Sequence, residues 1–153
     1  MSNTFTQIYI QAVWAVKYRN SVLDKKWRQE LFAVVGNLIN QTGCKTYIVN
    51  GVEDHIHCFF SLKPSVSLSD VMQVAKGRSS KWLNETNYLD NRFEWQRGFG
   101  GFSYSKSSVN NVYNYIKNQE NHHKKNKFLD EYIEYLQKFE IDFDKNYIFK
   151  EMI

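Results

Sequence analysis

Two strand-like segments separated by only two residues limit the possible folds of this 153-residue chain more than any other feature. Residues 45–52 and 55–62 are rich in β-branched and aromatic side chains, and the intervening Glu53-Asp54 suits a tight turn. Pro64, the only proline, closes the second segment, because proline cannot donate a backbone hydrogen bond to a neighbouring strand. The pattern predicts an antiparallel β-hairpin.

The segments around the hairpin predict a regular order of strands and helices. In chain order we expect a strand over 7–16, a helix that Asp24 caps and Gly43 ends, the hairpin, a helix over 69–83 capped by Ser67 or Ser69, and a short strand near Phe102. This βαββαβ order indicates an α+β protein with the ferredoxin-like, or RRM-like, plan of an antiparallel sheet with helices on one face. We expect one domain over residues 1–153, since a chain of this length buries a core without staples.

Two more helices are expected after the last strand. The first begins at Ser107 or Ser108 and runs through Gln119, and the second, which is acidic, covers 129–139. Charge divides the chain at about the same place: residues 130–153 carry a formal charge of −4, so the rest carries +8. A basic body predicts a polyanionic partner, with nucleic acid as the first candidate.

Nothing in the sequence predicts secretion or a membrane partner. Cys44 and Cys58 form neither a CxxC pair nor a disulfide framework, so we expect reduced thiols. The first residues lack the basic and apolar regions of a signal peptide. The longest apolar stretch, 8–16, is too short to span a bilayer. These features predict a cytoplasmic protein.

His55 and His57 form the first candidate site. Side chains at i and i+2 of a strand share a face, so both imidazoles can reach one metal ion. The alternative is a pair of hydrogen-bonded core histidines without a metal.

Tyr115 and Gln119 form the second half of the candidate site. At roughly 100° per residue they lie about 40° apart on one helix face, whereas Tyr113 lies about 120° from Gln119. Tyr115 would otherwise be an amphipathic tyrosine beside the apolar stripe of its helix. If the pairs meet, two imidazoles and an amide oxygen hold an ion with open positions, and Tyr115 can attack a phosphodiester that the ion polarises. A set without thiolate favours Mg²⁺ or Mn²⁺, with Zn²⁺ also open.

Basic and aromatic side chains predict DNA contacts, although each has a simpler interpretation. Lys76, Arg78 and Lys81 form either a DNA-binding or a merely solvated helix face. The glycines and aromatics of 95–105 either approach and stack on bases or pack as a turn against the core. His122 and His123 either join the site as extra ligands or lie on a lysine-rich surface.

Five segments together resemble a known family: Lys17-Tyr18-Arg19, Asp54-His55-Ile56-His57, Lys76-Gly77-Arg78-Ser79-Ser80, Trp95-Gln96-Arg97-Gly98-Phe99, and Tyr115-Ile116-Lys117-Asn118-Gln119 followed by His122-His123. The chain is similar to the single-tyrosine transposases with a His-hydrophobic-His (HUH) motif, of the insertion-sequence-two-hundred type, which include palindrome-associated tyrosine transposases. One departure is Gln11, where many members have histidine. Because 7–16 is not the metal strand, we expect this change to matter little.

The resemblance implies a function and a set of roles. His55, His57 and Gln119 would bind the metal, and Tyr115, on a C-terminal catalytic helix, would form a 5′-phosphotyrosine with single-stranded DNA near a hairpin. The DNA contacts would come from Lys17, Arg19, Lys76, Arg78, Arg97 and Phe99. A homodimer working on DNA in the nucleoid is expected, although palindrome-associated relatives can be monomers. The alternatives are a non-catalytic single-stranded nucleic-acid-binding module and a replication-initiator-type nickase.

Overall fold

The computed structural model describes residues 3–121 and 127–143, which form one four-stranded antiparallel sheet with helices on both faces. The elements are β1 (Tyr9–Ala15), η1 (Lys17–Arg19), α1 (Arg28–Gln41), β2 (Lys45–Gly51), β3 (His55–Ser61), α2 (Leu68–Glu85), β4 (Gly100–Tyr104), η2 (Lys106–Ser108), α3 (Val109–Lys117) and α5 (Phe128–Lys138). The strand order β2-β3-β1-β4 confirms the ferredoxin-like plan.

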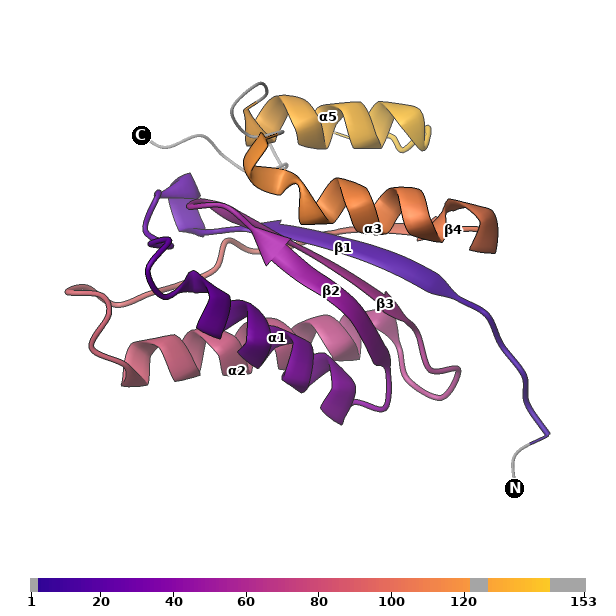
Figure 1. Cartoon of the computed structure of the whole chain (residues 1–153), viewed down its shortest axis with the longest axis horizontal. Helices are drawn as coiled ribbons and strands as arrows, with labels where there is room; N and C mark the ends of the chain where they lie inside the picture. Colours follow the sequence, from indigo (N-terminus) through magenta and orange to yellow (C-terminus); the bar gives the residue numbers. More distant parts are fainter. Residues whose placement is uncertain (1–2, 122–126, 144–153) are drawn as a thin grey trace.

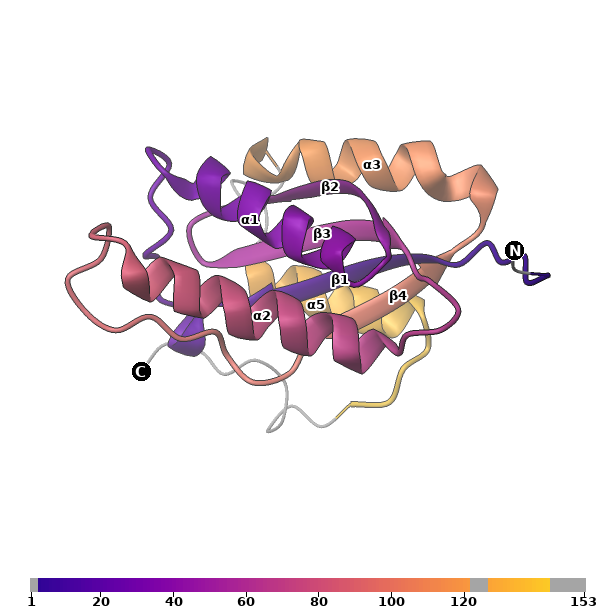
Figure 2. The ribbon, with the colours of Figure 1, turned by 90° about the horizontal axis from the view of Figure 1, so that it is seen from below.

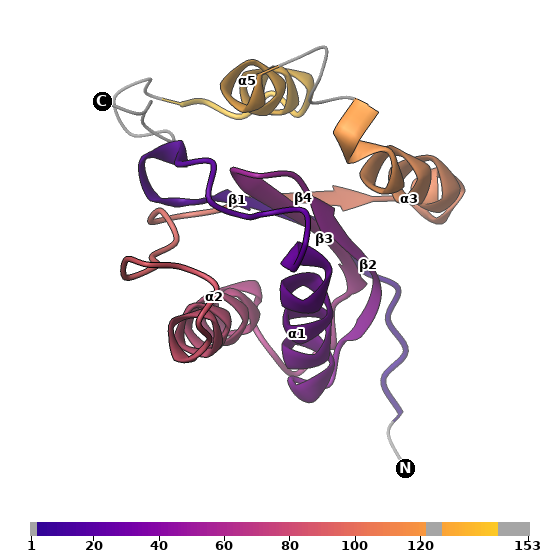
Figure 3. The same cartoon turned by 60° about the vertical axis from the view of Figure 1, so that its left-hand side comes forward.

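The helices divide between the two faces of the sheet (Figures 1 and 3). Helices α1 and α2 lie side by side across one face, as Figure 2 shows, and they are the pair that belongs to the βαββαβ order. Helices α3 and α5 lie on the opposite face. All seven residues of β1 are buried because this central strand is covered on both sides.

The hairpin forms as the sequence predicts. The backbone N–H of Val52 donates to the His55 carbonyl at 3.1 Å, and Glu53-Asp54 forms the turn between them. Because β1 and β3 are antiparallel with Val13 opposite His57 and Ala15 opposite His55, small or short side chains stand beside each imidazole. Side chains of cross-strand pairs share a face, so this register leaves room above the histidines.

Local chemistry explains where α1 ends and where α2 begins. Gly43 follows α1 with a φ of +96°, a conformation that glycine adopts without steric cost. Ser67 caps α2 by accepting a hydrogen bond from the Asp70 N–H at 3.0 Å.

The predicted Asp24 cap of α1 is wrong, because α1 begins at Arg28 with Trp27 at the N-cap position and no side-chain cap. The Asp24 carboxylate instead caps the preceding turn, where it accepts from the Lys26 N–H at 2.8 Å.

The predicted helix through Gln119 is wrong at its end. Helix α3 stops at Lys117, Asn118 leaves the helical conformation with φ −98° and ψ 24°, and helical conformation resumes at residues 119–121. The reason is a long-range cap: the Asn50 side chain, from β2, donates to the carbonyls of Ile116 at 2.9 Å and Lys117 at 3.1 Å. The two carbonyls therefore have a hydrogen-bond partner at the point where the helix is interrupted.

Helix α5 agrees with the predicted acidic helix to within one residue at each end. Its buried residues Phe128, Tyr132 and Leu136 recur every four positions and pack on the sheet. Gly100 of β4 permits this packing, because a Cβ there would lie 2.6 Å from the Tyr132 ring. Within the described residues, no helix has both the length and the hydropathy of a membrane span.

Candidate metal and nucleophile site

His55 and His57 project from β3 beneath α3 and α5, and both are fully buried. Their ring centroids lie 5.2 Å apart. The Nδ1 of His55 contacts the Asp54 carboxylate at 2.8 Å, and the Nδ1 of His57 accepts from the Gln11 amide nitrogen at 3.0 Å. Both rings are therefore held through Nδ1, and each Nε2 is directed towards the same space.

Two oxygen donors complete this cluster. The Gln119 Oε1 lies 3.2 Å from the His55 Nε2, and the Glu131 Oε1 lies 3.0 Å from the His57 Nε2. One ligand atom each from His55, His57 and Glu131 falls within 4.8 Å of the others. Since His55 donates its Nδ1 proton to Asp54, its Nε2 lone pair and the Gln119 oxygen both face the space that a cation would fill. The donor set fits a divalent metal ion.

Glu131 was missed by the sequence analysis, which treated its helix only as an acidic tail. It is 4% exposed and lies on the buried face of α5, three residues after Phe128 and one before Tyr132. A carboxylate on an apolar stripe was the available signal, because charged groups are rarely buried unless paired. Burial raises the pKa of this carboxyl, but the hydrogen bond with His57 and the charges of both imidazoles outweigh it and lower the pKa to about 2.

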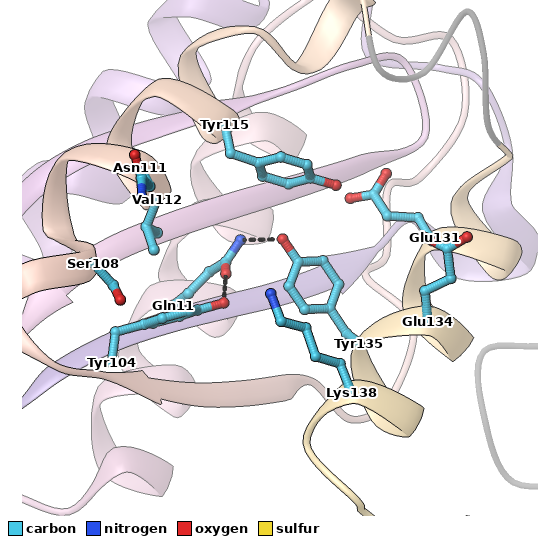
Figure 4. Close-up of a pocket in the computed structure, with 10 residues that line it drawn as sticks. All are labelled: Gln11, Tyr104, Ser108, Asn111, Val112, Tyr115, Glu131, Glu134, Tyr135 and Lys138. Atoms are coloured by element: carbon cyan, nitrogen blue, oxygen red, sulfur yellow. Dashed lines mark hydrogen bonds between the residues drawn. The ribbon is translucent and has the colours of Figure 1, made fainter.

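Tyr115 reaches the same cluster from α3. Its ring centroid lies 6.0 Å from that of His57 and 5.9 Å from that of Tyr135, and its phenol oxygen points at the Glu131 carboxylate (Figure 4). Burial and then the negative potential of Tyr135 and Glu131 raise its pKa far above the ordinary value. Tyr113 is 38% exposed and lies outside the cluster. The structure thus brings together the four residues that the sequence selected, which are His55, His57, Tyr115 and Gln119.

Gln11 also belongs to this site, contrary to the expectation that it matters little. Its amide nitrogen contacts His57 and donates to the Tyr135 hydroxyl at 3.3 Å, while its oxygen accepts from the Tyr104 hydroxyl at 2.7 Å. None of the candidate ligands lies on β1, but β1 is paired with β3, and this pairing places Gln11 beside the candidate ligand His57.

The predicted DNA-binding residues have different environments. Arg78 and Arg97 are exposed, whereas Phe99 packs partly against the core. Lys17 pairs with Glu94 at 2.8 Å on the surface, beside Arg19, which has an unusual φ of +52°. His122 and His123 lie outside the described residues.

Lys76 is engaged within the protein. Its amino group donates to the carbonyls of Gln96 at 2.8 Å and Gly98 at 2.7 Å, and burial lowers its pKa to about 8. Trp95 is similarly occupied, since its indole N–H donates to the Ser79 hydroxyl at 2.9 Å and its ring packs on Trp14. Residues 95–98 are therefore packed against α2 and the core, as the simpler interpretation of segment 95–105 predicts. The solvated helix face predicted as the alternative for Lys76 is wrong.

Comparisons with known proteins agree on one family. The family model described as "Transposase IS200 like" matches residues 4–119. The ISDra2 transposase TnpA of Deinococcus radiodurans is 27% identical over 75 residues, which cover 49% of this chain and only about half, 54%, of that protein. The transposase for insertion sequence element IS200 of Salmonella typhimurium is 27% identical over 113 residues, covering 70% of this chain and 73% of that protein.

Two solved structures share the fold. A crystal structure of a protein assigned as a transposase from Deinococcus radiodurans R1 aligns with a TM-score of 0.60 at 18% identity, covering 78% of this chain and 95% of that one. A REP-associated tyrosine transposase bound to a REP hairpin aligns with a TM-score of 0.59 at 14% identity, covering 80% and 73%.

Proposed function

This chain belongs to the IS200-like transposase family, and from that premise we propose that it cuts and rejoins single-stranded DNA at hairpin-bearing element ends through a 5′-phosphotyrosine intermediate. The observation that carries the proposal is the convergence of the Tyr115 hydroxyl with His55, His57, Gln119 and Glu131 in a single chain. A tyrosine beside a buried group of metal-ligating side chains is the arrangement that nucleophilic attack on a phosphodiester needs.

His55, His57, Gln119 and Glu131 would hold the ion, for which we propose Mg²⁺ or Mn²⁺. The Glu131 carboxylate strengthens this choice, because these cations favour charged oxygen ligands. When bound, the ion would polarise the phosphodiester and offset the negative charge that develops in the displacement. Ligation through the His57 Nε2 requires the ring proton on Nδ1, so the Gln11 amide has to turn and accept there with its oxygen.

The covalent step exchanges one phosphodiester for another. The Tyr115 oxygen bonds to phosphorus, and the bond between phosphorus and the 3′-oxygen breaks. The phenol loses its proton, and the released 3′-oxygen gains a proton to become a hydroxyl. Reversal with a free 3′-hydroxyl reseals the strand without another energy source. The Glu131 carboxylate faces the phenol and is also a proposed ligand of the ion, so we assign it to orienting the phenol together with Tyr135 rather than to accepting its proton.

The DNA partner and the assembly are also proposals. A hairpin in single-stranded DNA is the substrate we expect, in line with the hairpin in the solved relative and with the basic residues of this chain. Exposed Arg78 and Arg97 would contact phosphates. We keep the homodimer, acting on DNA in the nucleoid, as a prediction.

Covalent trapping tests the proposal. Labelled hairpin-bearing single-stranded DNA is incubated with protein and Mn²⁺, and adducts are counted after denaturation. Wild-type protein and Tyr113→Phe should form the adduct, and Tyr115→Phe should not, although it should bind DNA nearly as well. Duplex DNA or a chelator should prevent the adduct.

Other outcomes separate the alternatives. Binding without any adduct would indicate a non-catalytic module, and cleavage without rejoining would favour a nickase. An adduct that survives in Tyr115→Phe would overturn the assignment of the nucleophile.

A further inference from the structure

A cavity of about 390 Å³ opens directly beside the Tyr115 hydroxyl. Its lining comes from strands β1 and β4, from the turn before α3 and from helices α3 and α5, as Figure 4 shows. Tyr115 and Glu131 line this cavity and also belong to the metal and nucleophile site. A group bound in the cavity would therefore adjoin whatever reacts at Tyr115.

The walls of the cavity are fixed by internal contacts. Both polar atoms of the Gln11 amide are used, with Tyr104 and Tyr135 as partners. The Tyr135 ring is stacked on Phe102 with centroids 5.0 Å apart. The stacked rings thus form a pre-ordered aromatic wall, so a ligand that binds against it pays little ordering entropy.

Four polar side chains at the cavity are available to a ligand. In residues 3–121 and 127–143, no hydrogen bond or ion pair with protein groups is made by the side chains of Ser108, Asn111, Glu134 and Lys138. The Lys138 amine points into the cavity from α5, and Ser108 and Asn111 line its far side (Figure 4). Together the four side chains offer a hydroxyl, an amide, a carboxylate and a cation.

The size and chemistry suit a single unpaired nucleotide. Pockets for small ligands begin at about 300 Å³, so the cavity holds one nucleoside-sized group and excludes a duplex. Aromatic walls provide contact area for a base, an amide and a hydroxyl can pair with its edge, and an amine can meet its phosphate.

We propose that this cavity binds the nucleotide that adjoins the phosphodiester attacked by Tyr115, and that Asn111 and Ser108 select its base. The inference rests on the proposed function and extends it from a reaction to a sequence preference. It assigns to the protein itself the choice of one base at the cleavage position.

The test measures rates of adduct formation on oligonucleotides that carry each of the four bases on either side of the mapped cleavage position. Asn111→Ala and Ser108→Ala are compared with wild type. Asn110→Ala is the matched control, because Asn110 is exposed on the same helix, about 100° away, and does not line the cavity.

We expect wild type to prefer one base at one flanking position, and Asn111→Ala to reduce that preference about tenfold, the contribution of one good amide–base pair. Asn110→Ala should keep it. Mn²⁺ affinity and thermal stability should not change in either variant, which separates base selection from a structural role.

Two results would count against the inference. Adducts with an unchanged base profile in both Asn111→Ala and Ser108→Ala would overturn it while leaving the proposed function intact. Failure of the wild-type protein to form an adduct with any oligonucleotide would overturn the proposed function, and this inference with it.

Discussion

Gln11 connects the metal site to the nucleotide cavity through a single side chain. It holds His57 on one side and the hydroxyls of Tyr104 and Tyr135 on the other. A partner that orients an imidazole ligand affects metal binding nearly as much as a ligand does.

We therefore expect Gln11→Leu to lower Mn²⁺ affinity by about 10- to 100-fold, because His57 loses the group that fixes its ring. Calorimetric titration with Mn²⁺ measures the effect. Gln73→Leu, on the exposed face of α2, is the control and should bind like wild type. Equal Mn²⁺ affinity of Gln11→Leu and wild type would remove Gln11 from the site.

Glu131 gives a second prediction at the residue scale. Glu131→Gln keeps the shape of the side chain but removes the carboxylate charge from the donor set, so Mn²⁺ affinity should fall at least about tenfold. Asp130→Asn changes an exposed neighbour and should have no effect. The free Mn²⁺ signal in electron paramagnetic resonance reports both affinities. If the two variants bind alike, Glu131 is not a ligand.

Tyr115 and Glu131 show what residue patterns can predict. The pairing of Tyr115 with Gln119 followed from helix geometry alone, and both residues lie at the site although Asn118 interrupts the helix. Glu131 approaches His57 from a separate helix, and no spacing along the chain encodes that contact. The role of Gln11 likewise depends on strand register rather than on local sequence.

At the scale of elements, Lys76 joins α2 to the segment that leads into β4. Its two hydrogen bonds to backbone carbonyls fix residues 96–98 against the helix. A charged donor in two such bonds contributes more to stability than a neutral one.

Lys76→Met should lower the free energy of unfolding by about 2 kcal/mol, since hydrogen bonds to charged groups contribute on that order. Denaturant titration measures it. Lys81→Met, on the exposed surface of the same helix, should be close to neutral. A stable Lys76→Met variant with weakened DNA binding would instead restore the interpretation of Lys76 as a phosphate contact.

The order of elements was predictable because each depends on local patterns. The two-residue turn, the Ser67 cap and Gly43 are signals contained in a few neighbouring residues. The end of α3 was not predictable, because Asn50 supplies its cap from a strand about sixty residues earlier. Local chemistry therefore predicts that an element exists, and at α3 a tertiary contact decides where it stops.

For the whole molecule, the division of charge acquires a different meaning in the folded chain. The acidic residues after position 129 are not simply a tail set apart from a basic body, since α5 packs over the site and buries Glu131 there. Helices α3 and α5 lie over one face of the sheet (Figure 3), and both histidines are fully buried. Within the described residues, a single chain thus brings the proposed nucleophile together with the proposed metal ligands.

That arrangement predicts the outcome of a complementation experiment. Tyr115→Phe and His57→Ala, each inactive alone, should fail to restore cleavage when mixed, because the Tyr115 of one chain faces its own His57 with ring centroids 6.0 Å apart. Subunit exchange is verified by co-purification of differently tagged copies, and mixtures with wild-type protein provide the positive control. Recovery of cleavage in the mixed variants would mean that α3 is exchanged between subunits, since only then does one site receive both an intact tyrosine and an intact histidine pair.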